Sequence, residues 1–164
     1  RAVGYDRGMA IQEGKKAPSF SLADESGRQV GLSDFAGKDL ILYFYPRDDT
    51  PGCTKEACGF RDLWKQIEKR GAVVLGVSPD GADEHQKFRA KYKLPFSLLS
   101  DPDKKVMSAF GAWGEKTMYG KKVTGVIRST VWIGKDGAVR KHWARVAKAE
   151  AHPAQVLEAL EAAK

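Results

Sequence analysis

Two short apolar runs, separated by about one helix of chain, constrain the fold of this sequence more than any other feature. They are residues 40–45 (LILYFY) and 72–77 (AVVLGV). A continuous apolar run of this length is typical of a strand that is buried on both faces. Between the two runs, residues 53–70 carry apolar side chains at helical spacing, and the pattern ends at Gly71. Strand, helix and strand in this order predict a parallel βαβ unit.

Weaker patterns place further elements on both sides of this unit. We expect one hairpin over residues 19–32 and another over residues 128–143, a strand over 96–99, and helices over 83–92, 102–110 and 153–163. Residues 111–125 are rich in glycine and lysine, which predicts a loop near the functional face. The order predicts an α/β, thioredoxin-like three-layer sandwich with a central mixed sheet and an N-terminal hairpin extension.

Length and composition exclude several classes of protein. The chain has 164 residues and a net charge of +7, and its 28 basic residues are interleaved with 21 acidic ones. We expect one domain over residues 10–164, preceded by an extension over residues 1–9. No apolar stretch reaches the roughly 18 residues of a membrane span, and the first residues lack the apolar run of a signal peptide, so we expect a cytoplasmic protein. The basic residues form no long run, which argues against nucleic-acid binding as the main function.

The two cysteines, Cys53 and Cys58, are too few for a disulfide-stapled scaffold. A structural zinc site takes about four ligands, and the three histidines are widely scattered, so we expect neither a metal nor another cofactor. Redox chemistry and plain packing are the two roles that remain for the cysteines.

Cys53 falls where a thiol can become reactive. Thr50 is a good N-cap and Pro51 a good first helical residue, which makes Cys53 the third residue of the predicted helix. Backbone N–H groups in a first turn have no helical partner, and the helix dipole there favours a negative charge such as a thiolate. Free cysteines are nonetheless often simply buried, and these residues alone leave that alternative open.

A wider set of residues resembles a known family. Pro46-x3-Thr50-x2-Cys53 matches the active-site pattern of the peroxiredoxins, and residues 48–62 (DDTPGCTKEACGFRD) resemble their bacterioferritin comigratory protein branch, also called peroxiredoxin Q. Segments at 94–103 (LPFSLLSDPD) and within 113–130 (WGEKTMYGKK, GVIRST) continue the similarity, which runs from about residue 10 to the C-terminus. One small departure is Val131-Trp132, where the branch suggests a phenylalanine.

The resemblance implies a role for five residues. Cys53 would be the peroxidatic cysteine, whose thiolate attacks the peroxide O–O bond and becomes a sulfenic acid. Thr50 would align the peroxide, Arg128 would stabilise the thiolate and the developing oxyanion, and Pro46 would shield the pocket from water. Cys58 would resolve the sulfenic acid by forming an intramolecular disulfide with Cys53. Without the family resemblance, Thr50 is interpreted as a helix cap and Arg128 as a surface arginine. Pro46 is then the end of a strand, and Cys58 is a buried helical cysteine.

The implied activity is reduction of hydrogen peroxide and organic hydroperoxides by a monomer that thioredoxin recycles, without a prosthetic group. A disulfide reductase or a copper carrier on the same fold is the main alternative, although a reductase usually has Cys-x-x-Cys and this chain has four residues between its cysteines. A nucleic-acid or interaction module is a third. We expect Glu56 to be a solvated helix residue, and His85 and His152 to be exposed.

Helix geometry restricts the implied disulfide. Two residues five apart on one helix lie about 7.5 Å apart along the axis and about 140° apart around it, so their Cα atoms are roughly 8.6 Å apart. A disulfide requires at most about 7 Å. If residues 53–70 form one helix, that helix must therefore unwind around Cys53 before Cys53 can form a disulfide with Cys58.

Overall fold

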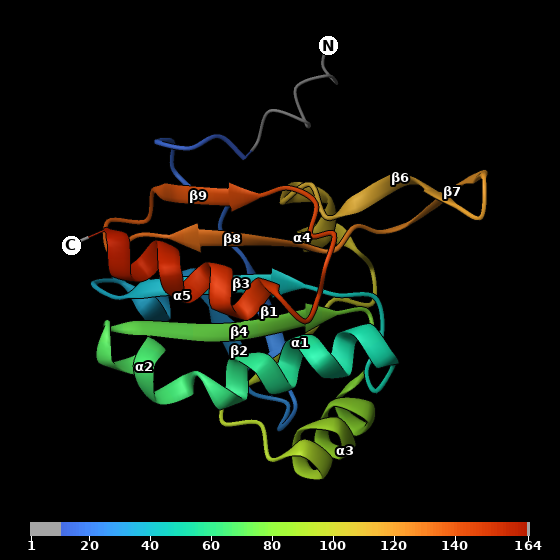
Figure 1. Ribbon diagram of the computed structural model, residues 1–164, viewed down its shortest axis with the longest axis horizontal. Helices are drawn as coiled ribbons and strands as arrows, with labels where there is room; N and C mark the ends of the chain where they lie inside the picture. The colour runs from blue at the N-terminus through green and yellow to red at the C-terminus, as the bar shows by residue number, and fades with distance from the viewer. Residues whose placement is uncertain (1–10, 164) are drawn as a thin grey trace.

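The computed structural model describes residues 11–163, so the predicted extension over residues 1–9 lies outside the described part (Figure 1). The strands are β1 (Ser21–Asp24), β2 (Gln29–Gly31), β3 (Asp39–Phe44), β4 (Ala72–Ser78), β5 (Leu98–Ser100), β6 (Trp113–Met118), β7 (Lys121–Val126), β8 (Ser129–Ile133) and β9 (Val139–Trp143). The α-helices are α1 (Pro51–Asp62), α2 (Trp64–Lys69), α3 (Ala82–Tyr92), α4 (Lys105–Ala109) and α5 (His152–Ala162).

Seven of these strands form one mixed sheet, in the order β2-β1-β5-β4-β3-β8-β9. The predicted βαβ unit is confirmed, because β3 pairs in parallel with β4 and β4 in parallel with β5. Strand β8 pairs antiparallel with β3 on the other side, with Ser129 opposite Phe44. Both predicted hairpins, β1–β2 and β8–β9, are also present. The predicted central mixed sheet of an α/β fold is thus confirmed.

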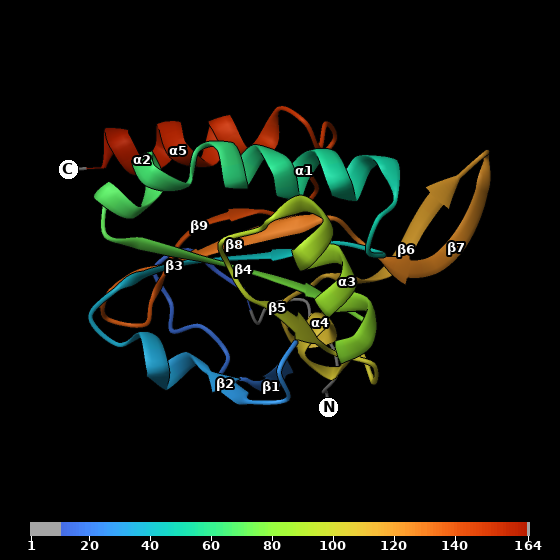
Figure 2. The ribbon, with the colours of Figure 1, turned by 90° about the horizontal axis from the view of Figure 1, so that it is seen from below.

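Alternate residues of β3 supply the two cores of the molecule. Ile41 and Tyr43, with Tyr45 just after the strand, belong to the core on the face covered by α1, α2 and α5. Leu40 and its alternating neighbours belong to the core on the face covered by α4 and the N-terminal hairpin (Figure 2). Every residue of β3 is buried, as expected for a central strand. Among the described residues, no helix has both the length and the apolar character needed to cross a bilayer.

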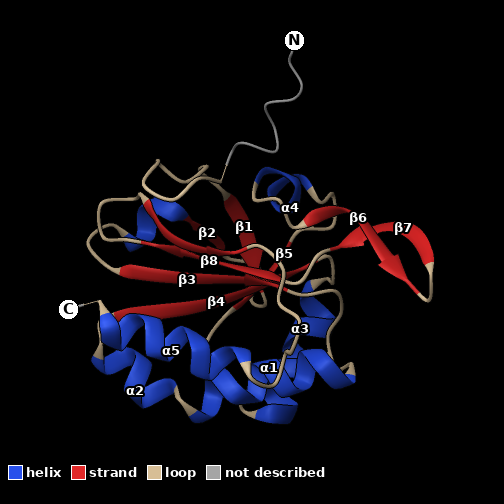
Figure 3. Cartoon of the chain, turned by 45° about the horizontal axis from the view of Figure 1, so that its top comes forward, coloured by secondary structure: helices blue, strands red, loops and turns tan. Residues whose placement is uncertain are grey.

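Two predicted elements are wrong in detail. The predicted helix over residues 53–70 is two helices, because the chain leaves helical geometry at Leu63 (φ −99°, ψ 6°), the C-cap of α1 and N-cap of α2. Residues 111–125 contain no long loop, since β6 and β7 form a two-stranded antiparallel hairpin. This hairpin extends away from the main sheet beyond the start of β8 (Figures 1 and 3). Most of its residues are exposed on both faces, which hides the alternation that identifies a strand.

Candidate active site

The loop that follows β3 places Cys53 at the start of α1. Thr50 is the N-cap residue with an extended backbone, Pro51 is the first helical residue and Cys53 the third, as predicted. The Cys53 side chain is buried, with 1% exposure. The Thr50 hydroxyl does not cap the helix but donates to the carbonyl of Arg47 at 2.9 Å. The Thr50 oxygen therefore keeps lone pairs with which it can accept a further hydrogen bond.

Arg128, immediately before β8, reaches this helix start from a distant part of the chain. Because β8 pairs with β3, the residue before Ser129 lies beside the loop that leaves β3. The Arg128 Nη2 atom lies 3.3 Å from the Cys53 Sγ atom. A Cβ atom on Gly52 would come within 3.2 Å of the same Nη2 atom. The absence of a side chain at Gly52 therefore lets the guanidinium approach the sulfur.

Glu56 is the site residue that the sequence interpretation missed. It was expected to be solvated, but its side chain is fully buried and its Oε1 atom accepts a hydrogen bond from Arg128 Nη1 at 2.6 Å. Its Oε2 atom is buried without a hydrogen-bond partner. Burial raises the pKa of Glu56 to about 7, although Arg128 opposes the shift. For Arg128, burial acts to lower the pKa, but Glu56 and Cys53 outweigh it and the pKa is raised.

A cavity of about 550 Å³ opens beside these groups. Pro46 and Arg128 line it together with the apolar side chains of Val126, Ile127 and Val146. The β6–β7 hairpin forms one wall, so the segment predicted as a loop does lie near the site. The place of Pro46 on the cavity wall suits the shielding role that the family resemblance implies.

Cys58 lies on α1, the same helix as Cys53. It is half-buried, and both cysteines are free thiols. The break at Leu63 comes after both residues, so the helix between them is continuous. The geometric conflict derived from the sequence therefore applies to the folded protein.

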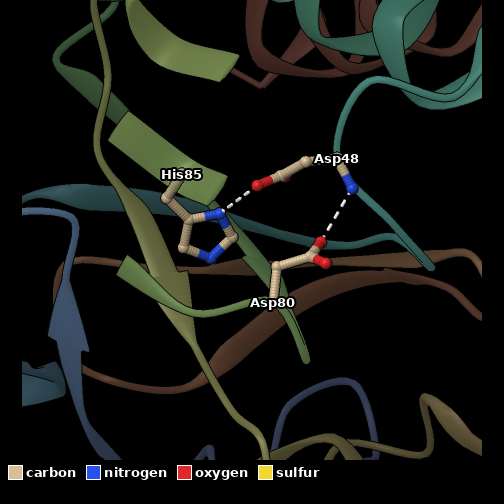
Figure 4. Close-up of side chains that lie close together, drawn as sticks. All are labelled: Asp48, Asp80 and His85. Carbon is tan, nitrogen blue, oxygen red and sulfur yellow. Dashed lines mark hydrogen bonds and ion pairs between the residues drawn. The ribbon is translucent and has the colours of Figure 1, made fainter. Parts of the chain in front are cut away.

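A second polar cluster includes Asp48, a residue of the loop between β3 and α1, with Asp48 and His85 buried and Asp80 half-buried. Asp48, Asp80 and His85 lie close together, and their potential ligand atoms are all within 4.8 Å of one another (Figure 4). These atoms already bond within the cluster, because His85 Nδ1 pairs with Asp48 Oδ2 at 2.6 Å and Asp80 accepts from the Asp48 N–H at 2.7 Å. The prediction that His85 and His152 are exposed is wrong, since both are fully buried.

The fold and this helix start together indicate a class of protein. A buried thiol beside unpaired backbone N–H groups, with an arginine at its sulfur, suits a thiol-dependent peroxidase. The model of the AhpC/TSA family matches residues 13–142. The chain is 50% identical to the putative peroxiredoxin bcp of Coxiella burnetii, over 91% of this chain and 98% of that protein. It is 46% identical to peroxiredoxin Bcp of Bacillus subtilis, over 93% and 96% respectively.

Solved structures agree with these relatives. A PrxQ mutant from Xylella fastidiosa superposes with a TM-score of 0.86 at 37% identity, covering 93% of this chain and 96% of that one. The bacterioferritin comigratory protein of Xanthomonas campestris, studied for its alkyl peroxide reduction activity, gives 0.81 at 42% identity, covering 87% and 90%. The chain belongs to the peroxiredoxins of the AhpC/TSA family, in the Bcp or peroxiredoxin Q branch. It is a thiol-dependent peroxidase with a thioredoxin-like fold, rather than a disulfide reductase or a nucleic-acid module.

Proposed function

We propose that Cys53 is the peroxidatic cysteine and that it reduces hydrogen peroxide and organic hydroperoxides. The observation that carries this proposal is the contact of Arg128 with both the Cys53 sulfur and the Glu56 carboxylate at the N-terminus of α1. The guanidinium and the unpaired N–H groups of the first turn favour the thiolate. The thiolate attacks the terminal oxygen of the peroxide, the electrons of the O–O bond leave with the other oxygen, and that oxygen is protonated to an alcohol or water.

The neighbouring residues orient this reaction. Because the Thr50 hydroxyl donates to the Arg47 carbonyl, its oxygen is free to accept the O–H of the incoming hydroperoxide. The second terminal nitrogen of Arg128 is bound to Glu56, which fixes the plane of the guanidinium. Pro46 lines the cavity together with Arg128, the residue that contacts the sulfur, and its role is to reduce the access of water. The apolar side chains of the same cavity suit the alkyl part of an organic hydroperoxide.

We assign Cys58 as the resolving cysteine. Its thiol attacks the Cys53 sulfenic acid, the S–O bond breaks, a disulfide forms and water leaves. A dithiol reductant then returns both thiols, and we propose thioredoxin for this role and a monomer as the working form. A cytoplasmic location remains an expectation from composition.

Peroxide consumption coupled to thioredoxin, thioredoxin reductase and NADPH tests these assignments, with a glutaredoxin system as the comparison. Cys53→Ser should abolish turnover, because a serine hydroxyl stays protonated at neutral pH. Cys58→Ser should still consume one thiol per peroxide but should turn over poorly with thioredoxin. Substantial thioredoxin-linked activity in Cys53→Ser would show that the nucleophile is misassigned.

A further inference from the structure

The active-site loop is tied down at Asp48, five residues before Cys53. The Asp48 side chain is buried, and its Oδ1 atom accepts a hydrogen bond from the Tyr45 hydroxyl at 2.5 Å. Its Oδ2 atom pairs with His85 Nδ1 at 2.6 Å, and its backbone N–H donates to Asp80 at 2.7 Å (Figure 4). One residue is thus held from the end of β3, from the segment after β4 and from α3. None of the three side chains bonded to Asp48 is among the hydrogen-bond partners of Cys53.

His85 completes the connection to the sheet. Its ring is fully buried, and its Nε2 atom lies 3.0 Å from the carbonyl oxygen of Leu99 in β5. A carbonyl has no hydrogen to give, so Nε2 is the donor to Leu99, while Nδ1 faces the Asp48 carboxylate. Burial keeps the pKa of Tyr45 well above its ordinary value, with Tyr43 and Asp48 adding to the effect, so its hydroxyl remains a donor. A buried network with every partner engaged is costly to break at any member.

The next residue contrasts with this anchor. Asp49 is exposed and has a left-handed backbone (φ 57°). Its carboxylate is bound by Lys91 at 2.8 Å and by Tyr92 at 2.7 Å, both on α3, and the Thr54 hydroxyl of α1 lies 3.4 Å away. Exposed ion pairs contribute little to stability, so these contacts can open at low cost. The firm attachment therefore ends at Asp48, and the weaker contacts begin at Asp49.

We propose that Asp48 and His85 are positioning residues, which hold the loop so that Thr50 and Cys53 face the peroxide and which set how readily α1 unwinds for the disulfide. The inference rests on the proposed roles of Cys53 and Cys58. Because Asp48 is bonded to Tyr45, to Asp80 and to His85 of α3, we expect unwinding to start after it. Loss of the anchor shifts the population from the closed helix toward the unwound one. The oxidation of Cys53 by peroxide then becomes slower, while formation of the Cys53–Cys58 disulfide becomes faster.

The test separates the two steps by stopped-flow fluorescence. His85→Leu removes both ring nitrogens at similar volume, whereas His85→Asn retains an amide group near the position of Nδ1. Val139→Ala, a buried change in β9 away from the loop, is the control for general loss of stability. We expect His85→Leu to slow Cys53 oxidation about tenfold, because Asp48 then loses one of the hydrogen bonds that hold the loop. The same variant should form the disulfide faster and, by mass spectrometry, accumulate less sulfinic acid at high peroxide.

His85→Asn should restore part of both rates, and Val139→Ala should change neither. Wild-type rates in His85→Leu, or the same changes in Val139→Ala, would overturn the positioning role. If His85→Leu does not fold, Asp80→Ala removes the acceptor of the Asp48 N–H, together with that of the Ser78 hydroxyl, and leaves the Asp48–His85 contact in place. It should shift both rates in the same directions by less, and unchanged rates there would also overturn the positioning role. Failure of the proposed function appears separately, as wild-type protein that forms no Cys53–Cys58 disulfide.

Discussion

Arg128 bridges Cys53 and Glu56, donating from one terminal nitrogen to the sulfur and from the other to the carboxylate. The bridge places one cation between two groups whose negatively charged forms it stabilises. A change at any of the three is therefore expected to affect the other two.

Replacing Arg128 tests the charge at the sulfur. Arg128→Ala should slow the oxidation of Cys53 about a hundredfold, because loss of one directed charge of this kind costs about 3 kcal/mol. Arg128→Lys keeps the charge but cannot bridge both partners. Its oxidation rate should therefore fall between those of the wild type and Arg128→Ala. Stopped-flow oxidation of each variant over a range of peroxide concentrations measures the effect. Equal rates for all three proteins would remove Arg128 from the reaction.

A methyl group at Gly52 should have a similar but smaller effect. The added Cβ atom would lie 3.2 Å from Arg128 Nη2, so the guanidinium must move to make room. We expect Gly52→Ala to slow oxidation about tenfold while the protein stays folded, since a displaced hydrogen bond costs on the order of 1 kcal/mol. Gly81→Ala is the matched control, because a Cβ atom there meets nothing within 4 Å. The same slowing in both variants would contradict this explanation.

Glu56 should make stability depend on pH. Its pKa is raised by burial from 4.5 to about 7, so the folded protein binds a proton in this range that the unfolded chain has released. Stability from this group is greatest below pH 4.5, falls as the pH rises toward 7, and is level above that. Glu56→Gln removes the titration. Urea unfolding at several pH values measures the effect. The free energy of unfolding of the wild type should fall relative to that of Glu56→Gln between pH 4.5 and about pH 7. A difference between the two proteins that stays constant with pH would argue against a buried titrating carboxylate.

Disulfide formation should unwind the start of α1. The helix is continuous from Pro51 to Asp62, and two residues five apart on it are too distant to bond. We expect the oxidised protein to lose amide protection over residues 51–60 and to show less helix by far-UV circular dichroism. Reduced protein and Cys58→Ser serve as controls. Equal protection in both forms, with the intramolecular disulfide confirmed by mass spectrometry, would rule out unwinding.

The sequence predicts those parts of the structure in which neighbouring residues share one environment. The apolar runs of β3 and β4 and the Thr50-Pro51 helix start are of this kind, and all were confirmed. Residues of the β6–β7 hairpin are mostly exposed on both sides, so no alternation marks them as strands. Helix α1 ends at Leu63, where no glycine or proline in the sequence predicts a helix end.

The buried charges were missed because their partners are distant in sequence. Glu56 pairs with a residue 72 positions away, and His85 with one 37 positions away. Each lies among polar neighbours that indicate a solvated helix, and only the folded sheet brings the partners together. A clue for Glu56 is its position on the same helical face as Cys53 and Phe60, which are buried.

The order of the strands also bears on protein synthesis. Residues 39–100 contain β3, β4 and β5, which pair in parallel, and with them Cys53 and the whole of the Asp48–His85 network. Arg128 comes 75 residues after Cys53 and reaches it only when β8 joins the opposite side of β3. A nascent chain emerging from the ribosome therefore exposes this thiol before its arginine has been made. If Arg128 activates Cys53 as proposed, the thiol should become sensitive to peroxide only after the C-terminal strands have docked.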